Sequence, residues 1–247
     1  MSIERRNFPQ FFVTAPSRCP YLPGRMERKV FTHLLGADAR NLNTQLSQGG
    51  FRRSQNIAYR PACDNCGACQ STRVPVKSFE WTKGFRRVMA KNADLSTALV
   101  RAQATSEQYS LFRSYIDTRH SEGGMADMSV LDFAAMVDDT VVDSRIVEYR
   151  LGATSISKGE LVAAVLVDVL GDGLSLIYSF YDPGHNDRSL GTFIILDMIR
   201  RVERMGLPYA YLGYLVRKSP KMAYKERFLP QERLTSQGWV LHEKMLD

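Results

Sequence analysis

The sequence predicts an α+β protein with an α/β-like order of elements. We expect an irregular, cysteine-bearing N-terminal region packed on a domain with a central mixed, mostly antiparallel sheet flanked by helices. Two observations predict this class. Residues 1–80 are rich in turns and poor in long apolar runs, whereas residues 81–247 alternate between helical and strand-like periodicity. The chain is therefore expected to have two parts that divide near residue 80.

The N-terminal part has three elements that its pattern predicts. Residues 11–16 and 55–61 have the short apolar runs of strands. Residues 38–50 form a predicted helix, with Asp38 as its N-cap and Gly49 just past its end. The rest of this part is expected to be loop, including the segment that holds three of the four cysteines.

The second part has a clear succession of helices and strands. Helical patterns occur at residues 83–93, 105–120, 129–139, 188–206 and 220–228. Strand patterns occur at residues 95–102, 145–151, 160–170, 174–182, 209–216 and 238–242. Thr105 and Gln108 form a capping box, Gly171–Gly173 is a hairpin turn, and Pro220 follows Ser219 as a helix start. This order is the layout of the fold that acetyl-CoA-dependent N-acetyltransferases use.

The charge of the chain is concentrated in one window. The formal net charge is +7, and residues 51–91 contain nine Arg or Lys against two acids, Asp64 and Glu80, which accounts for the whole excess. Such asymmetry favours a polyanionic partner, with nucleic acid as the first candidate and a solvated basic face as the alternative. The longest aliphatic run, residues 161–167, is too short to cross a bilayer. The start of the chain lacks a signal-peptide core, so the cytoplasm is the expected compartment.

The turn before the long helix argues against coenzyme A as the acyl donor. A coenzyme A enzyme needs a glycine-rich turn there, so that backbone N–H groups can hold the pyrophosphate. The sequence keeps Gly191 but has Leu190 and Thr192 beside it. An acyl donor of another kind fits better, and the basic window suggests aminoacyl-tRNA.

Several separated motifs carry a resemblance to a known family. They are "CPYLPGR", "GFRRSQNIAYRPACDNCGAC" with the "STRVPV" that follows, and "YLGYLVRKSPKMAYKERFLP". Together they resemble the bacterial aspartate/glutamate leucyltransferases, which are relatives of the arginyl-tRNA–protein transferases. The resemblance implies transfer of Leu from Leu-tRNA to the N-terminal amine of proteins that begin with Asp or Glu, which marks them for degradation by the N-end rule pathway. Arg as the donor is the alternative, and a coenzyme A-dependent N-acetyltransferase is a more remote one.

The chemistry of the aminoacyl ester and of the N-terminal amine is consistent with this reaction. An aminoacyl ester is already activated, so no cofactor is required, and neither DNA nor a membrane is an expected partner. An N-terminal amine has a pKa of about 7.7–8.0, so part of it is neutral at pH 7 without a strong base. Positioning of the two substrates and stabilisation of the oxyanion would then supply most of the acceleration. A non-enzymatic, metal-dependent RNA-binding module is a third hypothesis, which leaves the long second part without a purpose.

Candidate site residues come from three segments. Those expected to bind substrate or tRNA are Arg52, Arg53, Tyr59, Arg60, Arg188, Gly191, Lys218, Lys221 and Lys225. Guanidinium groups bind carboxylate and phosphate equally well, so the arginines leave open which one they hold. Lys221 and Lys225 are expected to share a helical face. The candidate catalytic residues are Tyr181, Asp182 and Tyr224, with His185 as a weaker proton acceptor, and packing or turn formation is the alternative for each.

The cysteines have the spacing of metal ligands. Cys63, Cys66 and Cys69 form a C-x2-C-x2-C run, and Cys19 would complete a four-thiolate site. A single run with a distant fourth cysteine is more typical of an iron–sulfur cluster than of zinc, whose ligands usually come in two separated pairs. Free thiols in a reducing compartment are the alternative.

Overall fold

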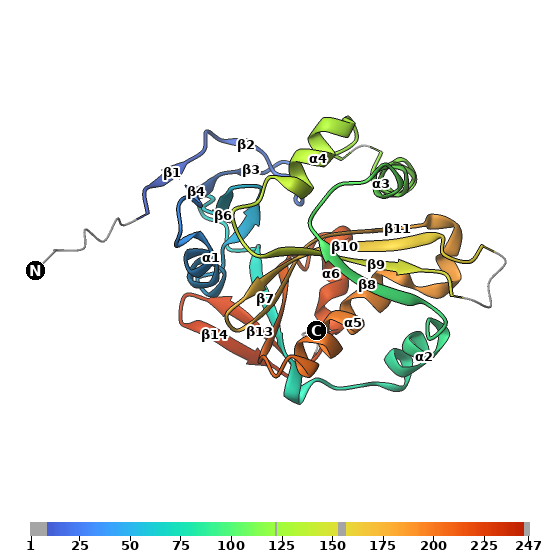
Figure 1. The fold of residues 1–247 in the computed structure, drawn as a ribbon. Coiled ribbons are helices and arrows are strands. Elements are labelled where there is room, and N and C mark those ends of the chain that lie inside the picture. The colour runs from blue at the N-terminus through green and yellow to red at the C-terminus, as the bar shows by residue number, and fades with distance from the viewer. Residues whose placement is uncertain (1–8, 122, 153–156, 245–247) are drawn as a thin grey trace, which may run out of the picture.

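Two sheets organise the chain in the computed structural model, which describes residues 9–121, 123–152 and 157–244 (Figure 1). The small sheet has the strand order β1-β4-β6-β5. Its strands are β1 (Phe11–Val13), β4 (Lys29–His33), β5 (Arg52–Ser54) and β6 (Ile57–Pro61). A separate two-stranded ladder consists of β2 (Ser17–Arg18) and β3 (Met26–Glu27).

The large sheet has eight strands in the order β14-β13-β7-β12-β11-β10-β9-β8. Their bounds are β7 (Gln70–Pro75), β8 (Ser96–Arg101), β9 (Ser144–Arg150), β10 (Leu161–Leu170), β11 (Gly173–Tyr181), β12 (Tyr209–Leu215), β13 (Gln231–Thr235) and β14 (Gly238–His242). All neighbours pair antiparallel apart from β11 and β12, which are parallel. The predicted α+β class, with a central mixed and mostly antiparallel sheet, is confirmed.

Helices cover both faces of the large sheet. They are α1 (Ala39–Gln48), α2 (Lys83–Lys91), α3 (Ser106–Arg119), α4 (Val130–Asp138), α5 (Leu190–Arg204) and α6 (Pro220–Ala223), with short 3-10 segments η1 (Val76–Ser78), η2 (Pro183–Arg188) and η3 (Tyr224–Arg227). One core cluster joins α2 and α5 to the sheet, and a second joins α3 and α4 to the other face. Because β10 lies between both layers, its run of apolar residues is buried on both sides. Within the described ranges, no helix is long and apolar enough to span a membrane.

The structure differs from the sequence prediction in several strands. β2, β3, β4, β5, β7 and β13 were not expected from the sequence, and the first predicted strand ends at Val13. β7 precedes the expected division near residue 80, yet it pairs with β12 and β13 inside the large sheet. The capping box of α3 is confirmed, whereas the side chains of Asp38 and Ser219 make no capping hydrogen bond.

A buried ion pair joins the two sheets. Arg53 of β5 binds Asp168 of β10 through two hydrogen bonds, Nε to Oδ2 at 2.6 Å and Nη2 to Oδ1 at 2.8 Å. Each side chain is 1% exposed. Ser144 and Asn43 also donate to the Asp168 carboxylate, which is therefore well compensated. Arg53 was expected to bind substrate, but its burial and its contacts support a structural role.

We expect Asp168→Ala to lower the free energy of unfolding by about 3–5 kcal/mol, because it leaves the Arg53 guanidinium buried without its counter-ion. Denaturant unfolding followed by circular dichroism measures the change. The double variant Arg53→Met with Asp168→Leu removes both charges and should recover about half of the loss or more. A single variant within about 1 kcal/mol of the wild-type protein would contradict this role.

Candidate functional site

A wedge opens between the two parallel strands at the centre of the large sheet. β11 and β12 pair only over their first three residues, ending at Ser175 opposite Tyr211. Each strand then continues, β11 to Tyr181 and β12 to Leu215, while held by its other neighbour. The edges that face each other across the wedge consequently carry backbone groups that the ladder leaves unpaired.

The guanidinium of Arg52 fills this wedge. Its Nη2 donates to the carbonyls of Ile177 at 2.7 Å and Leu176 at 3.1 Å on β11, and its Nη1 lies 3.5 Å from the carbonyl of Leu212 on β12. Gly213 makes room for it, since a Cβ there would lie 1.3 Å from Nη1. With φ at +76°, Gly213 also adopts a backbone conformation that favours glycine.

Tyrosines gather at the mouth of the wedge from different elements. The rings of Tyr115 on α3 and Tyr181 on β11 lie 4.8 Å apart, and the Tyr115 hydroxyl is 3.2 Å from Nε2 of His120. Burial raises the pKa of Tyr115, and the neighbouring phenols, those of Tyr181 and Tyr224 among them, raise it further. Tyr224 as a whole is half-exposed, but loss of solvent around its hydroxyl raises its pKa, which the charge of Arg52 partly offsets. The hydroxyls of Tyr115 and Tyr224 therefore stay protonated at neutral pH and act as hydrogen-bond donors.

Lys225 lies inside the protein beside Arg52, not on the surface. Its side chain is buried, and its Nζ donates to the carbonyl of Tyr214 on β12 at 2.7 Å. Burial and the charge of Arg52 lower its pKa well below the usual value. The expected face shared with Lys221 is absent, because α6 ends at Ala223 and the chain continues as a 3-10 turn. Lys221 itself is exposed, as is Lys218.

The charged residues after β11 have their partners within the protein. Oδ1 of Asp182 accepts a hydrogen bond from the Gly184 backbone at 2.7 Å, and Oδ2 lies 3.8 Å from Nε2 of His185. Arg188 binds both carboxylate oxygens of Asp94, at 2.8 and 2.9 Å, so its guanidinium is engaged within the protein. Asp182 therefore caps η2, and Arg188 links the end of η2 to the loop after α2.

Gly191 contributes space at the mouth of the wedge. A Cβ at this position would lie 3.0 Å from the Tyr181 ring, so glycine lets that ring lie against the first turn of α5. Arg119 of α3 lies over the other part of this ring, with its Cζ 5.8 Å from the centroid.

Tyr59 and Arg60 lie on β6 beside the wedge residue. Tyr59 is paired directly with Arg52 across the β5–β6 ladder, so the two side chains share a face. The Tyr59 carbonyl accepts the hydroxyl of Tyr214 at 3.1 Å. Arg60 is exposed and donates to the carbonyl of Gly49 at 3.1 Å. Tyr59 is therefore close to the candidate site, and Arg60 contacts the end of α1.

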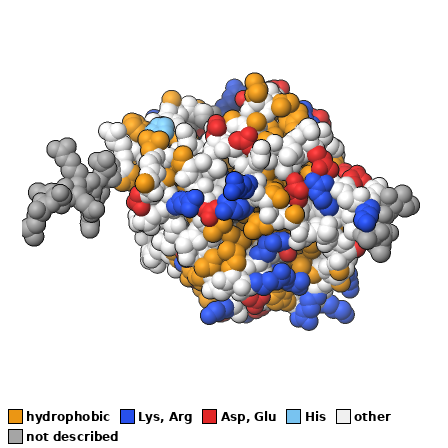
Figure 2. Space-filling model, in the orientation of Figure 1, with side chains coloured by type: hydrophobic (Ala, Val, Ile, Leu, Met, Phe, Trp, Pro, Cys, Tyr) orange, Lys and Arg blue, Asp and Glu red, His pale blue; other side chains and the backbone are white. Residues whose placement is uncertain are grey.

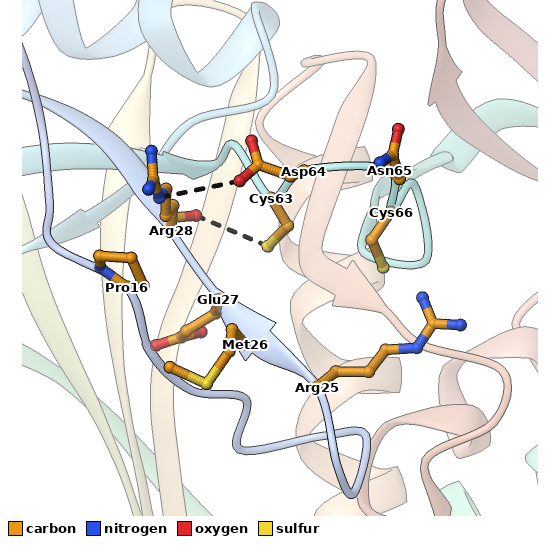
Figure 3. A pocket seen from close by; sticks show the side chains of 9 residues that line it. All are labelled: Pro16, Arg25, Met26, Glu27, Arg28, Cys63, Asp64, Asn65 and Cys66. Carbon is orange, nitrogen blue, oxygen red and sulfur yellow. Dashed lines mark hydrogen bonds and ion pairs between the residues drawn. The ribbon is translucent and has the colours of Figure 1, made fainter.

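The four cysteines line one cavity of about 100 Å³, next to a larger one of about 520 Å³. Figure 3 shows the larger cavity between the loop of Cys63 and Cys66 and the segment of Met26 and Glu27. All four thiols are free, and burial raises the pKa of Cys69 to about 12, with repulsion from the other three thiols adding to it. Within the described part of the chain, no three Cys, His, Asp or Glu side chains are grouped closely enough to hold a metal ion.

Comparison with known proteins assigns the chain to a family. The model for the N terminus of arginine-tRNA-protein transferases matches residues 17–87, and that for the C terminus matches residues 107–235. Curated aspartate/glutamate leucyltransferases from Afipia carboxidovorans and Xanthobacter autotrophicus are 61% and 60% identical to this chain. The alignments cover 97% and 99% of this chain and 96% and 100% of theirs. The chain belongs to this transferase family.

Among solved structures the likeness is weaker. L-PGS from Bacillus licheniformis matches with a TM-score of 0.44 at 11% identity, over 60% of this chain and 47% of that protein. FemX matches with a TM-score of 0.43 at 11% identity, over 68% and 58%. The assignment to the transferase family does not depend on either of them.

Three residues at the mouth of the wedge are not among the site residues predicted from the sequence of this transferase. Tyr115 and Arg119 lie four residues apart on α3, off the apolar stripe that predicts the helix, and Arg227 follows the short α6. The i, i+4 spacing of an aromatic and a cation was the available signal on α3. Only the fold shows that these residues meet β11 and α5.

We expect Gly213→Ala to destabilise the transferase more than Gly206→Ala does. Both positions have positive φ, at +76° and +70°, so both substitutions incur backbone strain. Only at Gly213 does the new Cβ collide with Arg52, whereas Gly206 has open space around it. Overpacking at Gly213 is expected to lower the free energy of unfolding by about a further 1–3 kcal/mol. Denaturant unfolding of the two variants, measured side by side, gives this difference. Equal losses would show that Arg52 moves away without cost.

Proposed function

We propose that this protein transfers leucine from Leu-tRNA to the N-terminal amine of proteins that begin with Asp or Glu. The names of its curated relatives support both the leucyl group and the acidic acceptor. The family models support an aminoacyl-tRNA as the donor. We propose leucine over arginine as the transferred residue because relatives that are 61% and 60% identical over nearly the full chain are named leucyltransferases.

The single observation that carries the proposal is the position of Arg52 in the wedge. A coenzyme A donor has an extended arm with amide groups, which needs unpaired backbone groups to bind in such an opening. Here Arg52 already binds carbonyls of both strands. The wedge instead offers a fixed positive charge and phenol donors at its mouth, which suits an ester carbonyl that develops negative charge.

The proposed reaction needs no cofactor. The neutral amine nitrogen of the acceptor attacks the ester carbonyl carbon, and a tetrahedral oxyanion forms. The hydroxyls of Tyr181 and Tyr224 are proposed to donate to this oxyanion, and the charge of Arg52 stabilises it through space. The bond to the ribose oxygen then breaks, the nitrogen loses its extra proton, and the leaving oxygen gains one. Asp182 is proposed to hold the turn that carries Tyr181.

The remaining parts of the proposal follow from the same assignment. Residues 1–80 would grip the substrates, with Arg60, Tyr59 and Cys-bearing loops nearby, and would contribute Arg52 to the transfer site that residues 81–247 otherwise form. Leucylation would mark the acceptor for degradation in the cytoplasm. The four cysteines line one cavity, but the proposal assigns them no metal, because in the described part of the chain no three of them are grouped closely enough to hold one. No step of the transfer passes through that site.

The proposal is tested by mixing the purified protein with peptides that begin with Asp, Glu or Ala and with separately charged Leu-tRNA and Arg-tRNA. We expect mass spectrometry to show one added leucyl residue on the Asp and Glu peptides only. A gain of Arg would contradict the proposed donor and keep the reaction. Acetylation from acetyl-CoA, with no aminoacyl transfer, would overturn the proposal.

We expect Tyr224→Phe to lower kcat for leucyl transfer by about 100-fold, the usual cost of losing one donor to an oxyanion, with little change in KM. Steady-state kinetics with varied Leu-tRNA measures both. Tyr178→Phe is the matched control, because Tyr178 is a tyrosine that packs on the core cluster of α3 and α4 and its hydroxyl has no assigned role. A kcat loss equal in the two variants would remove Tyr224 from the proposed chemistry.

A further inference from the structure

The outward face of α2 is uniformly basic. This nine-residue helix, with the sequence KGFRRVMAK, contains four basic residues and no acid. Lys83, Arg87 and Lys91 are spaced i, i+4, i+8 and therefore form one stripe along the helix. Phe85 lies on the opposite face, buried in the core between α2 and α5. The stripe is exposed to solvent over its whole length.

Most of this charge is not used inside the molecule. Within the described ranges, Lys83 and Arg87 make no ion pair and no side-chain hydrogen bond. Lys91 pairs with Asp187 at 2.9 Å, an exposed contact of small energetic value. Lysine and arginine side chains that crowd without counter-ions repel one another, so the stripe gains from an anionic partner.

Other cations surround α2 on its remaining sides. Arg86 of α2 donates to the Trp81 carbonyl at 2.8 Å, and Arg200 of α5 lies over the Trp81 ring at 5.4 Å, which extends the basic surface onto α5. On the side of α2 that carries Phe85, Arg227 lies 5.7 Å from the Phe85 ring centroid and donates to Thr192. Arg227 is close enough for its charge to act on the Tyr224 phenol.

Figure 2 shows Lys and Arg side chains gathered over the region where α2 lies in Figure 1. We name the surface formed by Lys83, Arg86, Arg87, Lys91, Arg200 and Arg227 the α2 basic strip. The strip includes Arg227, whose charge acts on the Tyr224 phenol.

We propose that the α2 basic strip binds the phosphate backbone of the donor RNA and so directs its aminoacylated end into the wedge. This inference rests on the proposed function. A double-stranded nucleic acid has about one charge per 1.7 Å of its axis. A nine-residue helix is about 14 Å long and offers cations over a matching distance. A membrane surface fits less well, because the apolar face of α2 is packed against α5 rather than free to insert.

The test compares a double charge reversal in the strip with a single charge reversal elsewhere on the molecule. Lys83→Glu with Arg87→Glu reverses the unpaired half of the strip. Arg40→Glu reverses an exposed arginine on α1, at the other side of the molecule (Figure 1). The Kd for uncharged tRNA is measured at several salt concentrations, and the KM values for Leu-tRNA and for the acceptor peptide are measured at one. Circular dichroism checks the fold, and Lys83→Gln with Arg87→Gln supplies a milder version of the same change.

We expect the double reversal to raise the Kd for tRNA by about tenfold or more and to reduce the slope of log Kd against log salt by about 2. The Arg40→Glu variant should bind tRNA like the wild-type protein. Equal Kd values in all three proteins would overturn the inference. A raised KM for the peptide with an unchanged Kd for tRNA would also overturn it and assign the strip to the acidic acceptor. Binding of uncharged tRNA does not require transfer, so the Kd tests this inference alone. The proposed function is tested separately and would be overturned if the wild-type protein failed to transfer leucine.

Discussion

The ion pair between Arg53 and Asp168 fixes how the small sheet sits on the large one, and the candidate site depends on that placement. Successive residues of a strand point to opposite faces, so anchoring Arg53 on β10 also sets the direction of Arg52. Arg52 then reaches into the wedge and binds β11 and β12. The wedge therefore contains a residue from each sheet, and neither part of the chain forms the site alone.

The concentration of positive charge in residues 51–91 has two separate structural uses. Arg52, Arg53 and Arg73 lie within the protein, where their guanidinium groups bind carbonyls, carboxylates and aromatic rings. The basic residues of α2 lie on the surface without enough acids to balance them. Interpreting the whole window as a polyanion surface was therefore too simple, because arginine serves equally well as a buried connector.

The sequence predicts elements whose side chains repeat with one clear period, such as α3 with its capping box, the β10–β11 hairpin and α5. It misses β7 and β4, because a strand that crosses to another sheet or alternates only partly is defined by its partners rather than by its own pattern. The same limit applies to site residues. Tyr181 and Tyr224 are predicted from their segments, whereas the burial of Lys225 depends on a helix that ends one turn early.

The charge at the wedge is controlled by two neighbouring cations of different character. Arg52 and Lys225 bind the carbonyls of Leu212 and Tyr214 on the same strand, while Gly213 between them accepts from Thr72 on the other side. A guanidinium stays charged in any such setting, whereas a buried ammonium beside it is driven toward the neutral amine. The pair therefore leaves one dominant positive charge at the wedge. A single fixed charge can stabilise a transient oxyanion without also trapping the anionic RNA that must leave after transfer.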